Sequence, residues 1–142
     1  MSEGRKSPSR SGNLKEIRDA AANGMIFVIE DDPDLASALC DLLRISGYRA
    51  AHAVDGIAAL EMLGDSDLPD LILLDLMLPR LDGWGFRERQ LADNRLSGIP
   101  VVVLSAVGEI VRPIKADHLL RKPVAPDTLL ASIERFRLHR PA

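Results

Sequence analysis

The stretch LILLDLMLPRLDGW, residues 71–84, contains the pattern that decides the fold. A run of Leu and Ile leads into Asp75, and Pro79 and Gly83 follow that aspartate at intervals of four residues. The apolar run is typical of a strand buried on both faces, as in a parallel sheet. The proline and glycine then favour a loop that turns the chain away from the strand. This stretch therefore predicts a buried strand that ends in a carboxylate.

Strand and helix patterns alternate on both sides of this stretch. Strands are predicted at residues 25–30, 48–53, 70–77, 100–106 and 119–122. Helices are predicted at residues 33–46, 55–64, 83–94 and 126–139. Strands that alternate with helices form βαβ units, and their right-handed crossovers place helices on both faces of the sheet. The chain is therefore predicted to have an α/β fold with a doubly wound, five-stranded parallel sheet.

Length and composition exclude several classes of protein. The 142 residues suit one domain, and 46% apolar with 27% charged residues is a globular composition. The single cysteine, Cys40, excludes a disulfide framework and a Cys-rich zinc site, and we assign it to the core. The net charge of −3 argues against direct nucleic-acid binding. Neither a membrane span nor a secretory signal is recognisable, so we expect a cytoplasmic protein.

The first 24 residues differ from the remainder. Residues 1–24 contain five Lys or Arg and three Asp or Glu, and the first thirteen are rich in Ser, Gly, Arg and Pro. We interpret residues 1–24 as a basic, flexible extension in which residues 14–23 can form a short helix. Residues 25–142 form the predicted domain.

Four of the five predicted strands end in polar or charged residues. These are Glu30, Asp31 and Asp32 after the first strand, Asp75 at the end of the third, Ser105 at the end of the fourth and Lys122 at the end of the fifth. The carboxyl ends of strands in an open parallel sheet lie along one edge, where ligands bind. We therefore expect these residues to form one site.

The residue types at this edge point to phosphoryl chemistry. Neighbouring carboxylates repel one another, and a divalent cation relieves that repulsion. Oxygen ligands with no His or Cys favour Mg²⁺ over zinc. An aspartate can act as the nucleophile toward phosphorus, while a lysine and a hydroxyl stabilise the charge that develops.

Four segments together resemble the receiver domain of two-component response regulators. They are VIEDDPDL (28–35), LILLDLMLPRLDGW (71–84), VVVLSA (101–106) and RKP (121–123). The resemblance covers about residues 25–138 and implies the flavodoxin-like receiver fold. Their combination in this order is specific, whereas each segment alone is weak.

The resemblance implies a role for each residue of the predicted site. Asp75 would be the phosphoacceptor. Mg²⁺ would be held by Glu30, Asp31, Asp75 and the backbone carbonyl of Met77. Ser105 and Lys122 would contact the phosphoryl group, and the Lys122–Pro123 peptide bond would be cis. Asp32 is interpreted as a flanking or helix-capping acid.

Two departures from the family pattern affect the transmission of a signal. Leu119 stands three residues before Lys122, where the family usually has Tyr or Phe as a switch residue. Residues 106–118 are also barely long enough for a crossover, and Pro113 limits helix formation there. We therefore predict a short or irregular fourth helix and an altered readout.

The resemblance implies a signalling protein and not an enzyme, apart from self-phosphorylation by small donors and slow autodephosphorylation. We expect a single-domain response regulator that receives its phosphoryl group from a sensor histidine kinase or a histidine phosphotransfer protein. Phosphorylation would switch its binding to an unknown downstream protein, and homodimerisation stays open.

Three other functions compete with this one. A phosphate-independent pseudo-receiver that acts as an adaptor is favoured by the two departures and disfavoured by the complete acidic pocket. A phosphatase of the haloacid dehalogenase type would need an acid two residues after Asp75, where Met77 stands. Dinucleotide binding would need a glycine-rich turn after the first strand, and none is present.

Overall fold

The computed structural model describes residues 23–65 and 67–139 of the chain. The predicted basic extension up to residue 22 and nearly all of the short helix expected at 14–23 lie outside these residues. The division between an extension and a domain therefore stays a prediction.

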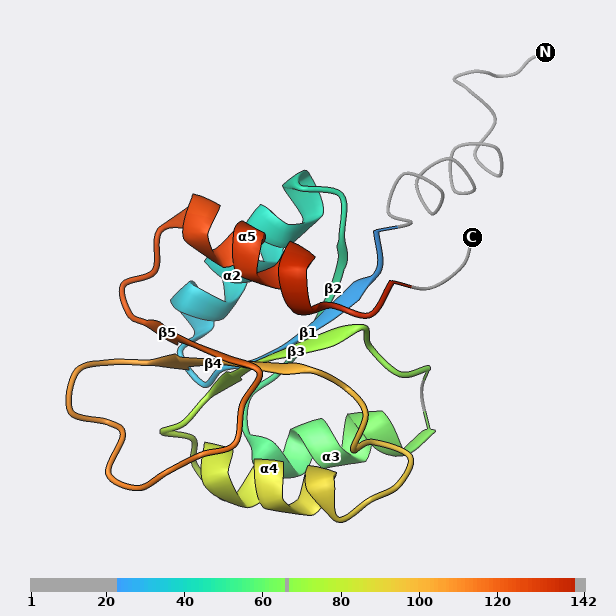
Figure 1. Ribbon diagram of the computed structural model, residues 1–142, viewed down its shortest axis with the longest axis vertical. Helices are drawn as coiled ribbons and strands as arrows, with labels where there is room; N and C mark the ends of the chain where they lie inside the picture. The colour runs from blue at the N-terminus through green and yellow to red at the C-terminus, as the bar shows by residue number, and fades with distance from the viewer. Residues whose placement is uncertain (1–22, 66, 140–142) are drawn as a thin grey trace.

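Five parallel strands form one sheet in the order β2-β1-β3-β4-β5 (Figure 1). The strands are β1 (Met25–Ile29), β2 (Arg49–Ala53), β3 (Leu71–Asp75), β4 (Val101–Ser105) and β5 (His118–Arg121). The described helices are α2 (Pro33–Ile45), α3 (Gly56–Asp65), α4 (Gly83–Leu91) and α5 (Pro126–Phe136). The predicted α/β fold with a doubly wound parallel sheet is confirmed.

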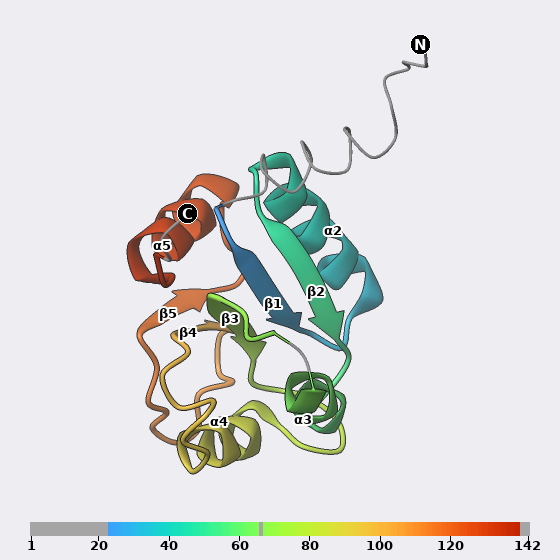
Figure 2. The ribbon, with the colours of Figure 1, turned by 90° about the vertical axis from the view of Figure 1, so that its right-hand side faces the viewer.

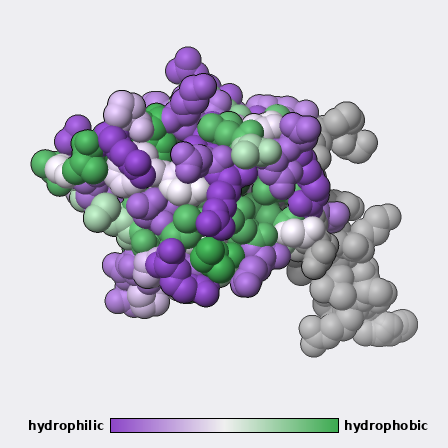
Figure 3. Space-filling view, turned by 90° about the horizontal axis from the view of Figure 1, so that it is seen from below, coloured by the Kyte–Doolittle hydropathy of each residue, from purple (hydrophilic) through white to green (hydrophobic). Residues whose placement is uncertain are grey.

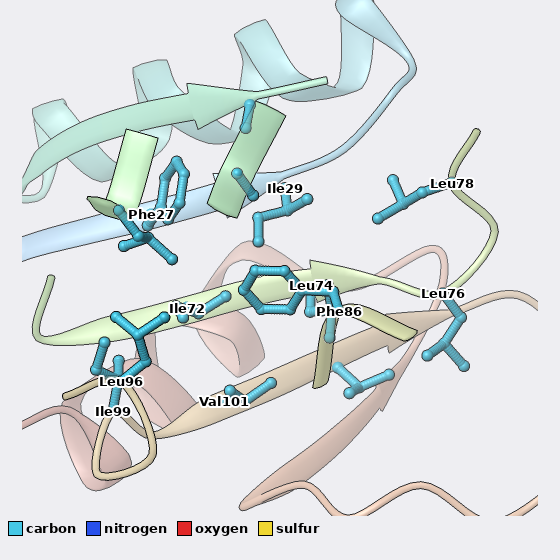
Figure 4. Packing of buried hydrophobic residues seen from close by; sticks show 14 residues of the cluster. Phe27, Ile29, Ile72, Leu74, Leu76, Leu78, Phe86, Leu96, Ile99 and Val101 are labelled. Atoms are coloured by element: carbon cyan, nitrogen blue, oxygen red, sulfur yellow. The ribbon is translucent and has the colours of Figure 1, made fainter. Parts of the chain in front are cut away.

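Helices cover both faces of the sheet, with α2 and α5 on one side and α3 and α4 on the other (Figures 1 and 2). Successive side chains of a strand point to opposite faces, so each central strand contributes to two cores. In β1, Phe27 and Ile29 pack toward α3 and α4, while Ile26 and Val28 pack toward α2 and α5. Figure 4 shows the first of these cores, with Phe86 of α4 against the sheet. Cys40 is buried in the second core, as expected.

Several predicted elements end earlier than the sequence pattern indicates. The strand expected at 70–77 ends at Asp75, because the N–H of Leu78 turns back to the carbonyl of Leu76. The helix expected at 126–139 ends at Phe136, because Arg137 is extended and the next N–H, that of Leu138, bonds to a distant carbonyl near β3. The helix expected at 83–94 likewise ends at Leu91. The ends of β3 and α5 are thus set by hydrogen bonds to partners outside the element.

The connection between β4 and β5 forms no helix. Residues 106–117 run as an irregular segment beside α4, and we call them the β4–β5 segment (Figure 2). The short or irregular fourth helix predicted from the sequence is therefore absent, and this part of the prediction is wrong. The segment is instead anchored to α4: the indole N–H of Trp84 donates to the carbonyl of Arg112, and Arg87 Nε donates to the carbonyl of Lys115.

A buried polar network supports this arrangement. Gln90 is fully buried on α4, and its amide nitrogen donates to the carbonyls of Leu96 and Ile99 at 3.0 Å each. Its amide oxygen accepts from Arg87, whose own Nε reaches the β4–β5 segment. Buried polar groups are tolerated when they are hydrogen-bonded. One chain of bonds therefore joins α4, the loop before β4 and the β4–β5 segment.

The surface on the side of α3 and α4 is mixed in character. Figure 3 views the molecule from this side and shows apolar patches interrupted by hydrophilic side chains. Among the described residues, none of the helices combines the length and the apolar character needed to cross a membrane.

Candidate functional site

The site lies at the carboxyl edge of the sheet, where the central strand β3 ends. Asp75 is the last residue of β3, and its side chain is only 4% exposed. Glu30 follows β1 on one side of β3 and is 2% exposed. Ser105 ends β4 on the other side and is also buried, and Lys122 follows β5. The parallel topology therefore brings together the four strand ends that the sequence analysis singled out.

The loop after β3 passes very close to the end of the strand. The N–H of Gly83 donates to the carbonyl of Leu76 at 2.8 Å. A Cβ atom at Gly83 would lie 2.7 Å from the backbone oxygen of Asp75 and 2.7 Å from Cα of Leu76, closer than real Cβ atoms approach. Only glycine permits this contact. The spacing of Gly83 from Asp75 thus reflects the tight return of the chain past the site.

An ion pair holds the same loop from its other side. Arg80 has a positive φ of 63° and donates from Nε to Asp55 Oδ2 at 2.7 Å and from a terminal nitrogen to Oδ1 at 3.1 Å. Asp55 also accepts from the N–H of Ala58 in the first turn of α3. The Arg80 guanidinium holds the pKa of Asp55 below its usual range. The loop is thus tied to the start of α3.

Lys122 lies between two buried carboxylates. Its Nζ atom is 3.0 Å from Glu30 Oε1 and 3.3 Å from Asp75 Oδ1. The other oxygen of Glu30 accepts from the backbone N–H of Asp32. Glu30 therefore has a partner on each oxygen.

Asp75 is less well satisfied. Its Oδ1 atom is buried and accepts no hydrogen bond from any described residue, since Lys122 approaches without hydrogen-bond geometry. Native proteins rarely leave a buried charged acceptor without a donor, because such a group has lost its water and gained nothing in return. An acceptor of this kind at a strand end is suited to bind an added cation or to form a new bond.

The pKa shifts of Glu30, Asp75 and Lys122 also indicate that the site has too little positive charge for its two buried carboxylates. Burial raises the pKa of both Glu30 and Asp75, and Lys122 offsets only part of that effect. Burial lowers the pKa of Lys122, but its hydrogen bond to Glu30 and the charge of Asp75 outweigh that effect and raise the pKa overall. The lysine therefore stays charged, while the two buried acids lack sufficient positive charge.

Three carboxylates are placed to hold a cation. Glu30, Asp31 and Asp75 each offer an oxygen, and the three oxygens lie within 4.8 Å of one another. The donor set consists only of carboxylate oxygens, and its exposed member, Asp31, leaves room for water. Asp75 also has an unsatisfied Oδ1 atom. These properties fit Mg²⁺, which prefers carboxylate and water ligands. The cluster is typical of the magnesium site that the sequence predicted.

The structure also shows where the other residues singled out in the sequence lie. Asp32 caps α2, because its side chain accepts from the N–H groups of Asp34 and Leu35, and so it is the capping acid that was expected. The Lys122–Pro123 peptide bond is cis. Met77 lies in the loop after β3, where its N–H contacts the Asp75 carboxylate. Its carbonyl as a metal ligand and Ser105 as a phosphoryl contact stay predictions.

Leu119 lies on the edge strand β5, paired with Val103 of β4, and is 37% exposed. It cannot reproduce the hydrogen bond or the ring of an aromatic switch residue. The altered position therefore lies next to the β4–β5 segment that lacks a helix.

Two features of the site were not predicted from the sequence. One is the Asp55–Arg80 pair, for which an acid before a helix and a base after Pro79 give only a weak signal. The other is Glu109, whose Oε1 accepts from the backbone N–H of Ala106 at 2.6 Å, directly after Ser105. An acid in the turn Ala-Val-Gly-Glu is the only sequence signal for that contact.

Comparison with known families agrees with this geometry. Residues 26–134 match the profile of the response regulator receiver domain, which spans most of the chain. The chain belongs to the response regulator receiver family. A receiver is a phosphoacceptor signalling module and not a catalytic enzyme, so the phosphatase and dinucleotide hypotheses are set aside.

Curated relatives contain the same domain within longer proteins. The receiver is 39% identical over 113 residues to the DNA-binding dual master transcriptional regulator RpaA of Synechocystis, covering 76% of this chain and 46% of RpaA. It is 39% identical over 120 residues to the DNA-binding response regulator MtrA of Mycolicibacterium smegmatis, covering 81% of this chain and 50% of MtrA. The chain thus spans about half the length of these relatives.

Solved structures share the fold. The receiver domain of a signal transduction histidine kinase from Syntrophus aciditrophicus superposes with a TM-score of 0.75 at 30% identity, covering 80% of this chain and 89% of that one. The receiver domain of a sensor histidine kinase from Pseudomonas aeruginosa, solved with a magnesium ion in its active-site cleft, gives a TM-score of 0.73 at 26% identity. That match covers 80% of this chain and 97% of the other.

Proposed function

We propose that this receiver is phosphorylated on Asp75 by a sensor histidine kinase or a histidine phosphotransfer protein, and that phosphorylation changes which protein it binds. The observation that carries the proposal is the buried Oδ1 of Asp75, which lacks a hydrogen bond from the described residues and lies beside Lys122 and two further carboxylates. A kinase partner follows from membership of the receiver family.

Transfer of the phosphoryl group exchanges one bond to phosphorus for another. A carboxylate oxygen of Asp75 forms a bond to phosphorus, and the bond from phosphorus to the imidazole nitrogen of the donor breaks with its electron pair going to that nitrogen. Glu30, Asp31 and Asp75 would hold Mg²⁺, which when bound neutralises part of the charge on the phosphoryl oxygens. Water attack on phosphorus later releases phosphate and restores the carboxylate.

Lys122 and Ser105 would stabilise the product. The ammonium group of Lys122 is already 3.3 Å from Asp75 Oδ1 and needs only a small movement to pair with a phosphoryl oxygen. Ser105, at the end of the adjacent strand, would donate its hydroxyl hydrogen. Phosphorylation would therefore draw both groups toward Asp75, and the ends of β4 and β5 would move with them.

The proposal is tested by the intact mass of the protein after incubation with acetyl phosphate. We expect one phosphoryl increment that requires Mg²⁺ and is lost in Asp75→Asn. Asp67→Asn removes the same charge from the exposed loop before β3 and serves as the matched control, which should label like the wild type. Equal labelling of Asp75→Asn and wild type would refute Asp75 as the phosphoacceptor.

A phosphate-independent adaptor is the second candidate, and two observations favour it. The position of the aromatic switch is Leu119, and no helix forms between β4 and β5. If Mg²⁺ binds, as shown by a titration, but acetyl phosphate adds no mass, the adaptor function replaces the first proposal. Its partner would then bind the unmodified protein.

A further inference from the structure

The chain leaves β4 through a turn that closes on itself. Residues 106–109, which we call the 106–109 turn, follow Ser105 directly. The Glu109 carboxylate accepts from the Ala106 N–H at 2.6 Å, and the Glu109 N–H donates back to the Ala106 carbonyl at 3.2 Å. Gly108 has a φ of +84°, which a residue with a side chain rarely adopts. The side chain of Glu109 is thereby held inward against the end of β4.

This turn stands next to the phosphoacceptor. Asp75 of β3 is opposite Leu104 in the ladder with β4, so the turn begins two residues beyond the residue that faces Asp75. The negative charge of Glu109 acts on Asp75 and adds to burial, the larger effect, in raising the pKa of that carboxyl. A more highly charged group attached to Asp75 would feel the same repulsion more strongly.

A phosphoryl group on Asp75 would compete with Glu109 for a nearby backbone donor. It brings a charge of about −1.5 to −2 and three acceptor oxygens. Ala106 provides the first backbone N–H beyond the buried end of β4, and that N–H already donates to a carboxylate. Two anions competing for one donor also repel each other, so both cannot be held there at low cost.

We infer that Glu109 is an internal competitor of the phosphoryl group: its carboxylate holds the Ala106 N–H in the unphosphorylated protein, and phosphorylated Asp75 displaces it and opens the 106–109 turn. The inference rests on the proposed function, because it needs a phosphoryl group on Asp75. It names the regulation of that site.

The displacement would reach a surface that a partner can read. Val107 in the turn is 75% exposed, and Val111 shortly after it is 78% exposed. Both lie in the β4–β5 segment, whose firm anchors to α4 come later, at Arg112 and Lys115. Opening the turn therefore moves the early part of the segment while the later part stays attached. This route needs neither an aromatic residue at position 119 nor a helix between β4 and β5.

The first test measures the rate of labelling by acetyl phosphate in the presence of Mg²⁺. Glu109→Ala frees the Ala106 N–H. We expect labelling to be about tenfold faster, because the phosphoryl group no longer has to break a hydrogen bond to a charged group. Glu109→Gln keeps an acceptor oxygen without the charge, so its rate should lie between those of Glu109→Ala and wild type. Glu88→Gln, the same change at an exposed position on α4, is the matched control and should label at the wild-type rate. Thermal unfolding of each variant checks that it is folded, and the glutamine variant carries the test if the alanine variant is not.

The second test measures hydrogen exchange of a peptide spanning residues 106–112. In the wild type, phosphorylation should speed exchange in this peptide severalfold. In Glu109→Ala the unphosphorylated protein should already exchange fast, and phosphorylation should add little. Both results support an opened turn.

The outcomes distinguish a failure of the proposed function from a failure of the inference about Glu109. If neither wild type nor Glu109→Ala is labelled, the proposed function fails and takes the inference with it. If Asp75 is labelled at the same rate in wild type, Glu109→Ala and Glu109→Gln, the inference fails and the proposed function stands. Faster labelling with no change in exchange on phosphorylation of the wild type would leave Glu109 as a competitor and overturn the opening of the turn.

Discussion

Replacing Asp75 by its neutral isostere, Asp75→Asn, should stabilise the folded protein in buffer without Mg²⁺. The ionised carboxylate is attracted by Lys122 at 3.3 Å and repelled by Glu30 at 4.8 Å or less. At an effective dielectric constant near 20 these interactions amount to about 5 kcal/mol and at least ~3.5 kcal/mol, so they largely offset each other. The cost of taking the charge out of water is several kcal/mol and exceeds the difference. We expect the free energy of unfolding to rise by about 1–2 kcal/mol.

The pKa of Asp75 supports this sign. Folding raises that pKa, chiefly through burial, so the ionised carboxyl destabilises the folded state above the folded pKa. The destabilisation disappears as the pH falls below the unfolded value near 3.8. The gain in Asp75→Asn should therefore be full at pH 7 and shrink in acid.

Urea unfolding followed by the fluorescence of Trp84, the only tryptophan, measures the effect at pH 7 with EDTA. Asp67→Asn, in the exposed loop before β3, serves as the control and should unfold like the wild type. Mg²⁺ should narrow the gap, because only the wild type keeps all three carboxylates that would bind the ion. An Asp75→Asn protein that is no more stable than wild type, or a control that gains as much, would show that the buried charge is not the source of the strain.

Three further changes have expected outcomes. Gly83→Ala places a Cβ 2.7 Å from backbone atoms at the end of β3. The free energy of unfolding in urea should fall by about 1–3 kcal/mol, and labelling by acetyl phosphate should slow. Wild-type values for both would contradict the close packing. Trp84→Phe removes the indole donor to the β4–β5 segment, so hydrogen exchange within residues 110–115 should increase while exchange in β1 does not. In Glu134→Gln the pH dependence of stability should flatten in acid. The hydrogen bond from His139 and further partners lower the pKa of Glu134. The wild type therefore gains stability above about pH 4.5, and it loses this stability as the pH falls through the folded pKa. Thermal melting of both proteins at about pH 7 and about pH 3.5 measures the difference.

The order and type of the elements could be read from local patterns. The apolar runs that become β1, β3 and β4 are continuous because these strands are buried on both faces. The exact ends could not be read, because they depend on distant partners. The N–H of Leu138, for example, bonds to the carbonyl of Asp70 near the start of β3, and this contact across the chain ends α5 early.

The candidate site was predictable for a topological reason. A parallel sheet brings the residues that follow each strand to one edge, so Glu30, Asp75 and Lys122 meet although they are far apart in sequence. Glu109 was not predictable by this reasoning, because it reaches the site from within an irregular segment and binds a backbone N–H. The Asp55–Arg80 ion pair could not be predicted either, because it joins two loops that only the fold brings together.

The irregular course of the β4–β5 segment has a consequence for the shape of the response. A helix shifts as one rigid rod because each turn is bonded to the next, and its displacement is close to all-or-none. Residues 106–117 are instead held by one bond within the 106–109 turn and by two separate bonds from α4, to the carbonyls of Arg112 and Lys115. Such attachments can release one at a time, at free energies well below that of global unfolding. We therefore expect a graded output with intermediate levels, in which the tip near Val107 rearranges while the stretch beside α4 keeps its place.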